Sequence, residues 1–259
     1  MIHPSITNKQ KQIIFLFYKF RFLTINQLLK ILKHKDPHRI KEWLTDLADK
    51  KYLSLANIVN KKDVTKPYVY CLNTKAKYIL KENEDCDEIF FGRLYKEKSL
   101  TEIFISHCLF IAEIYLFFLA RKNPDSKLHF FTQHELKDFD NFPEEKPDAY
   151  IAVETKDGTD RYFLELYDKY REPAFLSRNK IKEYITFCED GTWQENTDNS
   201  PLPSILFVLA HDKRKKHIFH YGKALLEKTF EDMNLYLTTM DAIKFSNKDT
   251  NIWLKVDLD

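Results

Sequence analysis

The sequence is short of glycine and cysteine, and each shortage excludes a kind of site. Its 259 residues include only 4 Gly, and no GxGxxG or GxxxxGKS/T pattern occurs, which excludes the glycine-rich loops that cradle nucleotide phosphates. The 4 Cys are scattered and form no CxxC pair, a pattern that favours free thiols over disulfides or a zinc site. Free thiols are typical of a reducing compartment, so we expect a cytoplasmic protein.

Long apolar runs are also scarce, and the one long enough to cross a membrane is interrupted. Residues 103–120 are mostly apolar, but His107 and Glu113 lie in the middle of the run. A charged side chain at the centre of a bilayer costs at least ~2.5 kcal/mol. The run therefore predicts a buried core helix, and we expect no membrane partner.

Acidic residues are sparse in the first third of the chain. Residues 1–83 contain 17 Lys and Arg against 6 Asp and Glu, whereas residues 84–259 contain 24 against 33. The net charge of +2 therefore conceals a basic N-terminal module joined to an acidic one. A basic module attracts polyanions, and nucleic acid is the commonest such partner of a small domain. A lysine-rich solvated surface is the plainer alternative, but it would not distribute the acids so unevenly.

The spacing of apolar residues in the basic module predicts three helices followed by a hairpin. The expected elements are helices over 5–23, 25–32 and 37–51, strands over 52–58 and 67–72, and a closing helix over 74–81. Asp36-Pro37 is a strong start signal for the third helix, because aspartate caps a helix and proline suits its first turn. This order is that of a winged helix-turn-helix, whose third helix enters the major groove of DNA.

We expect this module to bind double-stranded DNA through the third helix and the loop of the hairpin, or wing. The residues placed to reach base edges are His38, Arg39, Lys41 and Thr45. The residues placed to neutralise phosphates are Lys61, Lys62 and Lys66 in the wing. An alternative stays open, because many winged helices bind protein and Glu42, Asp46 and Asp49 on the same helix would repel phosphate.

The acidic module contains a predicted hairpin that presents two carboxylates. Asp157-Gly158 separates two alternating runs, and an Asp-Gly pair is a strong hairpin signal. A two-residue turn there would pair Lys156 with Thr159. In that register Asp148 and Glu165 are diagonal neighbours on one face, with Cα atoms roughly 7–8 Å apart. A slip of one residue would place them on opposite faces.

Two carboxylates on one face can share a divalent cation. Hard oxygen ligands suit Mg²⁺ or Mn²⁺, which polarise a phosphoryl oxygen and lower the pKa of a water that attacks a phosphodiester. Glu113 in the long apolar helix is the candidate for an additional ligand, and its alternative role is a buried acid with a hydrogen-bond partner. Surface carboxylates are common, so the pair by itself does not establish a metal site.

A series of short motifs follows in order through the acidic module. They are Ser106-His107-Cys108-Leu109-Phe110, Lys146-Pro147-Asp148-Ala149, the stretch from Tyr162 to Asp168, Lys180-Ile181-Lys182-Glu183-Tyr184, and the strand Ser204–Ala210. Their order of helix, strand, Pro-Asp strand, Glu strand, helix and strand resembles the PD-(D/E)xK nuclease fold. Together with the basic module, the chain resembles the replication-relaxation family of plasmid and mobile-element proteins, which join a winged helix to such a domain. The resemblance spans residues 5–219.

One position departs from the nuclease pattern. The motif places lysine two residues after the glutamate, where it positions the attacking water and offsets negative charge, and here that residue is Tyr167. Two lysines are candidate replacements: Lys169, if the strand continues, and Lys180, from the following helix. The resemblance thus leaves both an inactive domain and an active nuclease open.

We therefore expect an α+β protein with a winged helix-turn-helix at 1–83 and a PD-(D/E)xK nuclease-like domain at 89–259, joined by the acid-rich segment 82–88. The first hypothesis is a DNA-binding factor in the replication or mobilisation of a plasmid or mobile element, with replication or mobilisation proteins as partners. The second is an endonuclease dependent on Mg²⁺ or Mn²⁺ that uses Asp148, Glu165 and Lys180 or Lys169. The third is a protein-interaction scaffold.

The basic run Lys213-Arg214-Lys215-Lys216 is predicted to be a loop, and it could contact the phosphate backbone of DNA.

Overall fold

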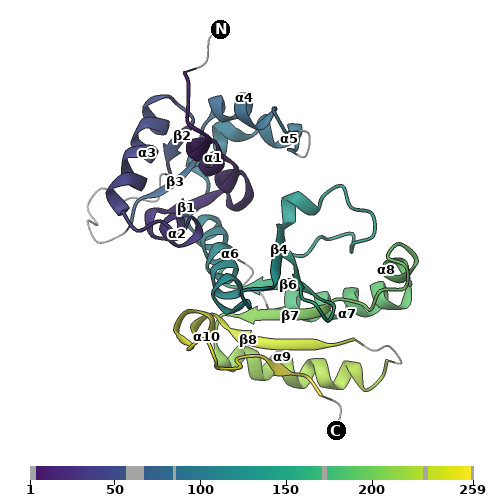
Figure 1. Ribbon diagram of the computed structural model, residues 1–259. Helices are drawn as coiled ribbons and strands as arrows, with labels where there is room; N and C mark the ends of the chain where they lie inside the picture. The colour runs from purple at the N-terminus through teal and green to yellow at the C-terminus, as the bar shows by residue number, and fades with distance from the viewer. Residues whose placement is uncertain (1–3, 57–66, 84–85, 171–173, 230–232, 258–259) are drawn as a thin grey trace. The chain divides into compact units, whose positions relative to one another are not determined.

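The chain divides into two compact units, residues 1–116 and 117–259 (Figure 1). The computed structural model describes residues 4–56, 67–83, 86–170, 174–229 and 233–257. The long helix α6, Glu102–Arg121, contains the division between the units.

The N-terminal unit consists of short helices around a three-stranded sheet. Its elements before α6 are α1 Asn8–Phe20, β1 Phe22–Thr24, α2 Ile25–Ile31, α3 Pro37–Asp49, β2 Leu53–Leu55, β3 Val69–Leu72, η1 Thr74–Ala76, α4 Lys77–Leu80, α5 Glu88–Phe91 and η2 Leu94–Ser99. The sheet has the order β1-β3-β2 with antiparallel neighbours. The unit therefore has the predicted order of three helices, two hairpin strands and a closing helix. Asp36 caps α3 as expected, with Oδ1 accepting a hydrogen bond from the His38 N–H at 2.8 Å.

The prediction that the first helix extends to Leu23 was wrong. The helix ends at Phe20, because Arg21 adopts a left-handed backbone conformation with φ 63° that an α-helix cannot continue. The next three residues form β1, which pairs with Val69–Cys71 of β3. Apolar periodicity could not reveal this strand, since its three residues are all buried and a short apolar run fits a helix equally well.

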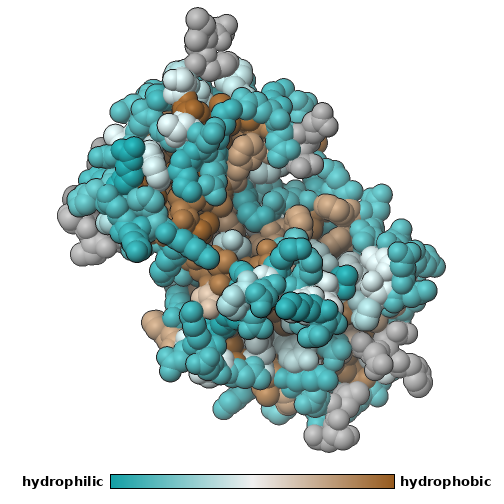
Figure 2. Space-filling view, in the orientation of Figure 1, coloured by the Kyte–Doolittle hydropathy of each residue, from teal (hydrophilic) through white to brown (hydrophobic). Residues whose placement is uncertain are grey.

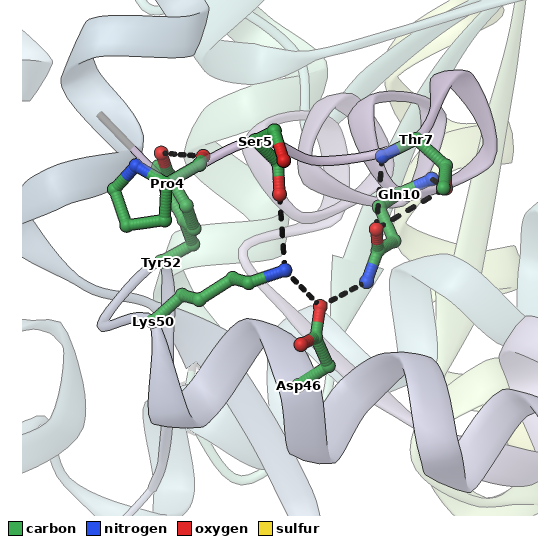
Figure 3. A network of polar contacts seen from close by, with 7 residues as sticks. All are labelled: Pro4, Ser5, Thr7, Gln10, Asp46, Lys50 and Tyr52. Atoms are coloured by element: carbon green, nitrogen blue, oxygen red, sulfur yellow. Dashed lines mark hydrogen bonds and ion pairs between the residues drawn. The ribbon is translucent and has the colours of Figure 1, made fainter. Parts of the chain in front are cut away.

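A network of polar contacts connects residues 4–10, which lead into α1, to the C-terminal part of α3 and the residues that follow it (Figure 3). Thr7 and Gln10 form a capping box at the start of α1, and the Gln10 Nε2 also donates to Asp46 Oδ2 at 2.6 Å. Lys50 Nζ donates to the same Asp46 oxygen at 2.7 Å and to the Ser5 carbonyl oxygen at 3.0 Å. The hydrogen bond from Lys50, more than any other interaction, lowers the pKa of Asp46 below its usual value. The network fixes the orientation of α1 relative to α3.

The first part of α6 packs in the N-terminal unit. Ile105 and Cys108 of α6 form one buried cluster with Phe22 and Cys71 of the sheet. These contacts explain why the compact unit extends to residue 116, whereas the sequence places the joint at 82–88. By length and composition alone α6 could cross a membrane, but its packing against Phe22 and Cys71 is that of a core helix.

The second unit is built on one six-stranded mixed sheet. Its elements are β4 Lys127–Thr132, η3 Gln133–Leu136, β5 Ala149–Glu154, β6 Thr159–Tyr167, α7 Ala174–Glu189, α8 Thr192–Glu195, β7 Ser204–Leu209, α9 Asp212–Leu226, β8 Leu235–Thr239, α10 Met240–Phe245 and β9 Leu254–Lys255. The strand order is β4-β5-β6-β7-β8-β9, with β6, β7 and β8 mutually parallel and the other neighbours antiparallel. The elements follow in the predicted order of a helix, three antiparallel strands, a second helix and a parallel strand. This order confirms the α+β class.

Two helices, α7 and α9, cover one face of this sheet. Phe163 of β6 stacks on Tyr184 of α7 with ring centroids 5.7 Å apart, and Ile218 of α9 belongs to the same buried cluster. The opposite face is also buried at the centre of the sheet, where Leu164 and Leu166 have no exposed surface. Burial of both faces is expected for parallel central strands.

The predicted register of the β5–β6 hairpin was wrong by two residues. Glu154 pairs with Thr159, so the connection has four residues, 155–158, rather than two. The Thr155 N–H closes it by donating to the Gly158 carbonyl oxygen at 2.8 Å. Because side chains alternate with a period of two, this even shift leaves every residue on its predicted face.

The basic run 213–216 was also predicted in the wrong conformation. It forms the first turn of α9 instead of a loop, and His211 caps this helix by accepting a hydrogen bond from the Arg214 N–H at 3.3 Å. The charged run masked the helix start, because its apolar residues begin only at Ile218.

Candidate functional site

The corrected register brings Asp148 and Glu165 closer together than predicted. Ala149 pairs with Leu164, so continuing the ladder by one residue places Asp148 opposite Glu165 instead of diagonal to it. Directly opposite residues of antiparallel strands have Cα atoms roughly 4.5–5.5 Å apart. Asp148 Oδ2 accepts a hydrogen bond from the Leu166 N–H at 2.7 Å, which ties the aspartate to the strand that holds Glu165.

The Glu165 carboxylate is completely buried beneath α7. Its exposed fraction is 0%, and its Oε1 accepts a hydrogen bond from the Tyr184 hydroxyl at 2.8 Å. Lys180 Nζ lies 3.8 Å from the same oxygen. A buried carboxylate needs such partners, because an unpaired charge in the protein interior costs several kcal/mol.

Lys180 connects the glutamate to the loop in front of β5. Its Nζ donates to the Glu145 carbonyl oxygen at 2.7 Å and lies 3.2 Å from Glu183 Oε2. The lysine side chain is only 4% exposed, whereas the Glu145 and Glu183 side chains are about half exposed. The ammonium group therefore lies at the boundary between a buried acid and two acids that reach the solvent.

The helix α7 supplies both partners of Glu165 because of its periodicity. Lys180 and Tyr184 are four residues apart, so they occupy one face of the helix. Burial, reinforced by the neighbouring Glu165 charge, raises the pKa of the Tyr184 hydroxyl well above its ordinary value of 10.0. The tyrosine hydroxyl therefore keeps its proton from neutral into alkaline pH and can donate to the Glu165 carboxylate over that range.

Tyr167, which replaces the motif lysine, is a core residue. It is 1% exposed, and its ring lies 5.0 Å from that of Phe207 on β7, measured between centroids. Of the two replacement lysines, the structure brings Lys180 to Glu165. Lys169 could share the face of Glu165 only if strand β6 continued to residue 169. The strand ends at Tyr167, and Lys169 is exposed in the following turn.

The candidate metal ligands do not form a ready cation site among the residues that the structure describes. No group of three or more His, Cys, Asp or Glu side chains in this part of the chain could hold a metal ion. Glu113 lies in the N-terminal unit, where its Oε1 accepts a hydrogen bond from Gln27 Nε2 at 2.9 Å. A cation at Glu165 would have to compete with the Tyr184 hydroxyl and the Lys180 ammonium group. The donor set therefore does not fit a preformed Mg²⁺ or Mn²⁺ site.

The helix α3 presents its predicted DNA-contacting residues to the solvent. His38, Arg39, Lys41 and Thr45 are all exposed. Figure 2 shows mainly hydrophilic residues on the left of the N-terminal unit, where α3 lies. The wing lysines Lys61, Lys62 and Lys66 lie outside the described residues.

The acids of α3 that would repel phosphate are largely engaged within the unit. Glu42 Oε2 lies 2.7 Å from Arg39 Nη1, and Asp46 takes part in the network with Gln10 and Lys50. The Arg39 guanidinium also lies over the Trp43 ring, 5.4 Å from its centroid. The remaining acid, Asp49, is exposed at the end of the helix.

Sequence reasoning missed two residues of the site, Tyr184 and Glu145. The signal for Tyr184 was its spacing of four residues from Lys180, which predicts a shared helix face. No comparable signal exists for Glu145, because it reaches Lys180 chiefly through its main-chain carbonyl oxygen.

The comparison that decides the family is a match over most of the chain. The family profile described as replication-relaxation matches residues 15–202. The chain belongs to the replication-relaxation family. The match includes α3 as well as Asp148, Glu165, Lys180 and Tyr184. No curated protein matches the sequence.

Two solved structures of the restriction endonuclease FokI resemble the chain weakly. The enzyme alone matches with 11% identity and a TM-score of 0.36, covering 94% of this chain and 44% of that one. The enzyme bound to DNA matches with 14% identity and a TM-score of 0.28, covering 94% and 45%. This replication-relaxation protein thus spans less than half the length of those chains.

Proposed function

We propose that this replication-relaxation protein binds duplex DNA through its N-terminal unit and serves in the replication or mobilisation of a plasmid or mobile element. The observation that supports this function is the exposed row of His38, Arg39 and Lys41 on α3, in a module with few acids. These side chains project from the third helix of a three-helix-plus-hairpin unit, the helix that enters the major groove in winged helices. Replication or mobilisation proteins are the proposed protein partners.

Substitution of α3 tests this proposal in the full chain. In a mobility-shift assay at low salt, the double variant Arg39→Ala/Lys41→Ala is expected to bind duplex DNA at least about ten-fold more weakly, because two cationic contacts are lost. Lys228→Ala, which removes an exposed charge from the other unit, serves as the control and is expected to bind like the wild type. Equal binding by all three proteins would contradict docking through α3, and absence of binding by the wild type would favour the protein-interaction scaffold.

A second candidate function is cleavage of DNA with Mg²⁺ or Mn²⁺. It is favoured by one contact, the 3.8 Å approach of Lys180 Nζ to Glu165 beside Asp148, which supplies a lysine although the motif position holds Tyr167. The Tyr184 hydroxyl, which donates to Glu165 Oε1 where a cation would bind, favours the non-cleaving alternative.

Supercoiled plasmid distinguishes the two candidates. If the domain is an enzyme, the wild type nicks plasmid in Mg²⁺ or Mn²⁺ and Glu165→Gln abolishes the nicking while duplex binding persists. If the domain no longer cleaves, the wild type and Glu165→Gln bind DNA equally and neither nicks it.

A further inference from the structure

A separate aromatic hollow lies on the sheet face that carries Asp148 and Glu165. It has a volume of about 430 Å³, which is within the roughly 300–1,000 Å³ of small-ligand sites. Its principal lining residues are Phe131, Phe139, Phe142, Tyr150, Arg161 and Trp193. Tyr150 lies two residues after Asp148, and Arg161 lies four residues before Glu165, so these side chains share the face of the acids.

The rings of the hollow are held in place by one another. Tyr150 stacks on Phe131 with centroids 6.2 Å apart and lies 6.1 Å from Trp193. Trp193 is 2% exposed, and its Nε1 donates to the Pro201 carbonyl oxygen at 3.0 Å. Phe139, in contrast, is 46% exposed at the rim. The hollow is therefore a wall of mutually packed rings, in which Phe131 and Tyr150 are half-buried and Phe139 is exposed at the rim.

Arg161 adds a positive charge to this wall. Its Nη1 donates to the Thr159 carbonyl oxygen at 3.2 Å, and a guanidinium group has five N–H donors in total. The side chain is half-buried, which anchors the planar group beside Tyr150. Along β6, four residues span roughly 13 Å, so Arg161 lies about that far from Glu165.

We propose that this hollow binds one unpaired nucleobase of single-stranded DNA, with Arg161 contacting the adjoining phosphate. Aromatic rings bind bases of any sequence by stacking, and arginine pairs with phosphate through parallel N–H donors. A base within a duplex is already paired and stacked on both sides, so an unpaired base enters the hollow at a lower cost in free energy. The inference rests on the proposed DNA-binding function and specifies its substrate: a single strand of DNA held beside the β5–β6 hairpin.

Stacking provides a direct test in the full chain. A single-stranded oligonucleotide of about 12 nucleotides, with 2-aminopurine at its centre, is titrated with protein in EDTA, so that cleavage cannot occur. Binding is expected to quench the 2-aminopurine fluorescence, because the base stacks on the rings. Phe139→Ala is expected to weaken binding by at least about five-fold and to reduce the quenching, and Arg161→Gln to weaken it with a shallower dependence on salt.

A matched control separates the hollow from general exposure of aromatic residues. Phe245→Ala removes a 79% exposed ring from α10 of the same unit and is expected to leave both readouts unchanged. Duplex binding measured in parallel keeps this inference distinct from the proposed function. Duplex binding without quenching, or equal quenching in Phe139→Ala and the wild type, would overturn the hollow alone. Failure of duplex binding in a protein that still quenches the probe would overturn only the docking role of α3.

Discussion

Glu165 is the residue on which the candidate site depends most, because its charge is buried and shared between two partners. Tyr184 donates a hydrogen bond at 2.8 Å and Lys180 contributes an ammonium group at 3.8 Å. Such an arrangement holds the carboxylate in one orientation at a cost in desolvation that the partners offset. Removing either partner is therefore expected to lower the stability of the fold and to affect any catalytic activity of the site.

Tyr184→Phe is expected to lower the free energy of unfolding by about 1–3 kcal/mol, because the variant leaves a buried carboxylate oxygen without its donor. Urea denaturation at neutral pH measures the change. Tyr221→Phe is the control. The variant retains the ring at position 221, whose centroid lies 5.6 Å from the Arg178 guanidinium, so the free energy of unfolding should change by no more than about 0.5 kcal/mol. A Tyr184→Phe protein as stable as the wild type would show that the hydrogen bond contributes nothing net.

The raised pKa of Tyr184 predicts a loss of stability in alkali. In the unfolded chain tyrosine ionises near pH 10, whereas the buried hydroxyl keeps its proton to higher pH. The folded state therefore binds more protons than the unfolded state above about pH 10, and its stability falls as the pH rises. The slope for Tyr184→Phe should be shallower by up to about 1.4 kcal/mol per pH unit. Parallel pH profiles for the two proteins would contradict this assignment.

At the scale of elements, the β5–β6 hairpin and the helix α7 together create the site. The sequence predicted both elements and the face on which the two acids lie. It could not give the length of the connection, since Asp157-Gly158 fits a two-residue turn as well as the end of a four-residue loop. Gly158 has φ 149°, a conformation that favours glycine in either case. The error left the faces intact only because the shift was even.

The tie between the two strands can be tested at Asp148. Asp148→Ala leaves the buried Leu166 N–H without its acceptor and is expected to destabilise the protein by about 1–3 kcal/mol in urea denaturation. Asp148→Asn keeps an acceptor oxygen and should lose less. Asp157→Ala, in the exposed connection of the same hairpin, should change stability by no more than about 0.5 kcal/mol. Equal effects at positions 148 and 157 would argue against the bond.

In the molecule as a whole, the uneven distribution of charge is consistent with the proposed docking of DNA on the N-terminal unit. Residues 1–83 carry the whole excess of lysine and arginine over acids, 17 against 6, and acids outnumber bases in the rest of the chain, 33 against 24. A basic module steers DNA to itself, while acids elsewhere reduce unspecific binding over the remaining surface. The exposed α3 gives this charge a defined surface.

The affinity for duplex DNA should therefore depend steeply on salt. If the three wing lysines each neutralise one phosphate, the logarithm of the binding constant should fall with the logarithm of salt concentration with a slope of about −2.7. Lys62→Ala should make this slope shallower by about 0.9. Fluorescence anisotropy over a series of salt concentrations measures both values, and a slope near zero would exclude docking through phosphates.

Local sequence patterns were enough to predict two modules, most of the helices and strands in their order, and the common face of Asp148 and Glu165. They missed the strand β1 and placed the joint at 82–88, whereas the first compact unit extends to residue 116. Local periodicity, capping residues and charge are properties of neighbouring residues, and they can be read without long-range contacts. Contacts between distant parts of the chain place Asp148 opposite Glu165, bring Lys180 rather than Lys169 to Glu165, and add the Tyr184 hydroxyl as its hydrogen-bond donor. These outcomes depend on loop length and on the packing of α7 over the sheet, which bring together residues that are distant in the chain.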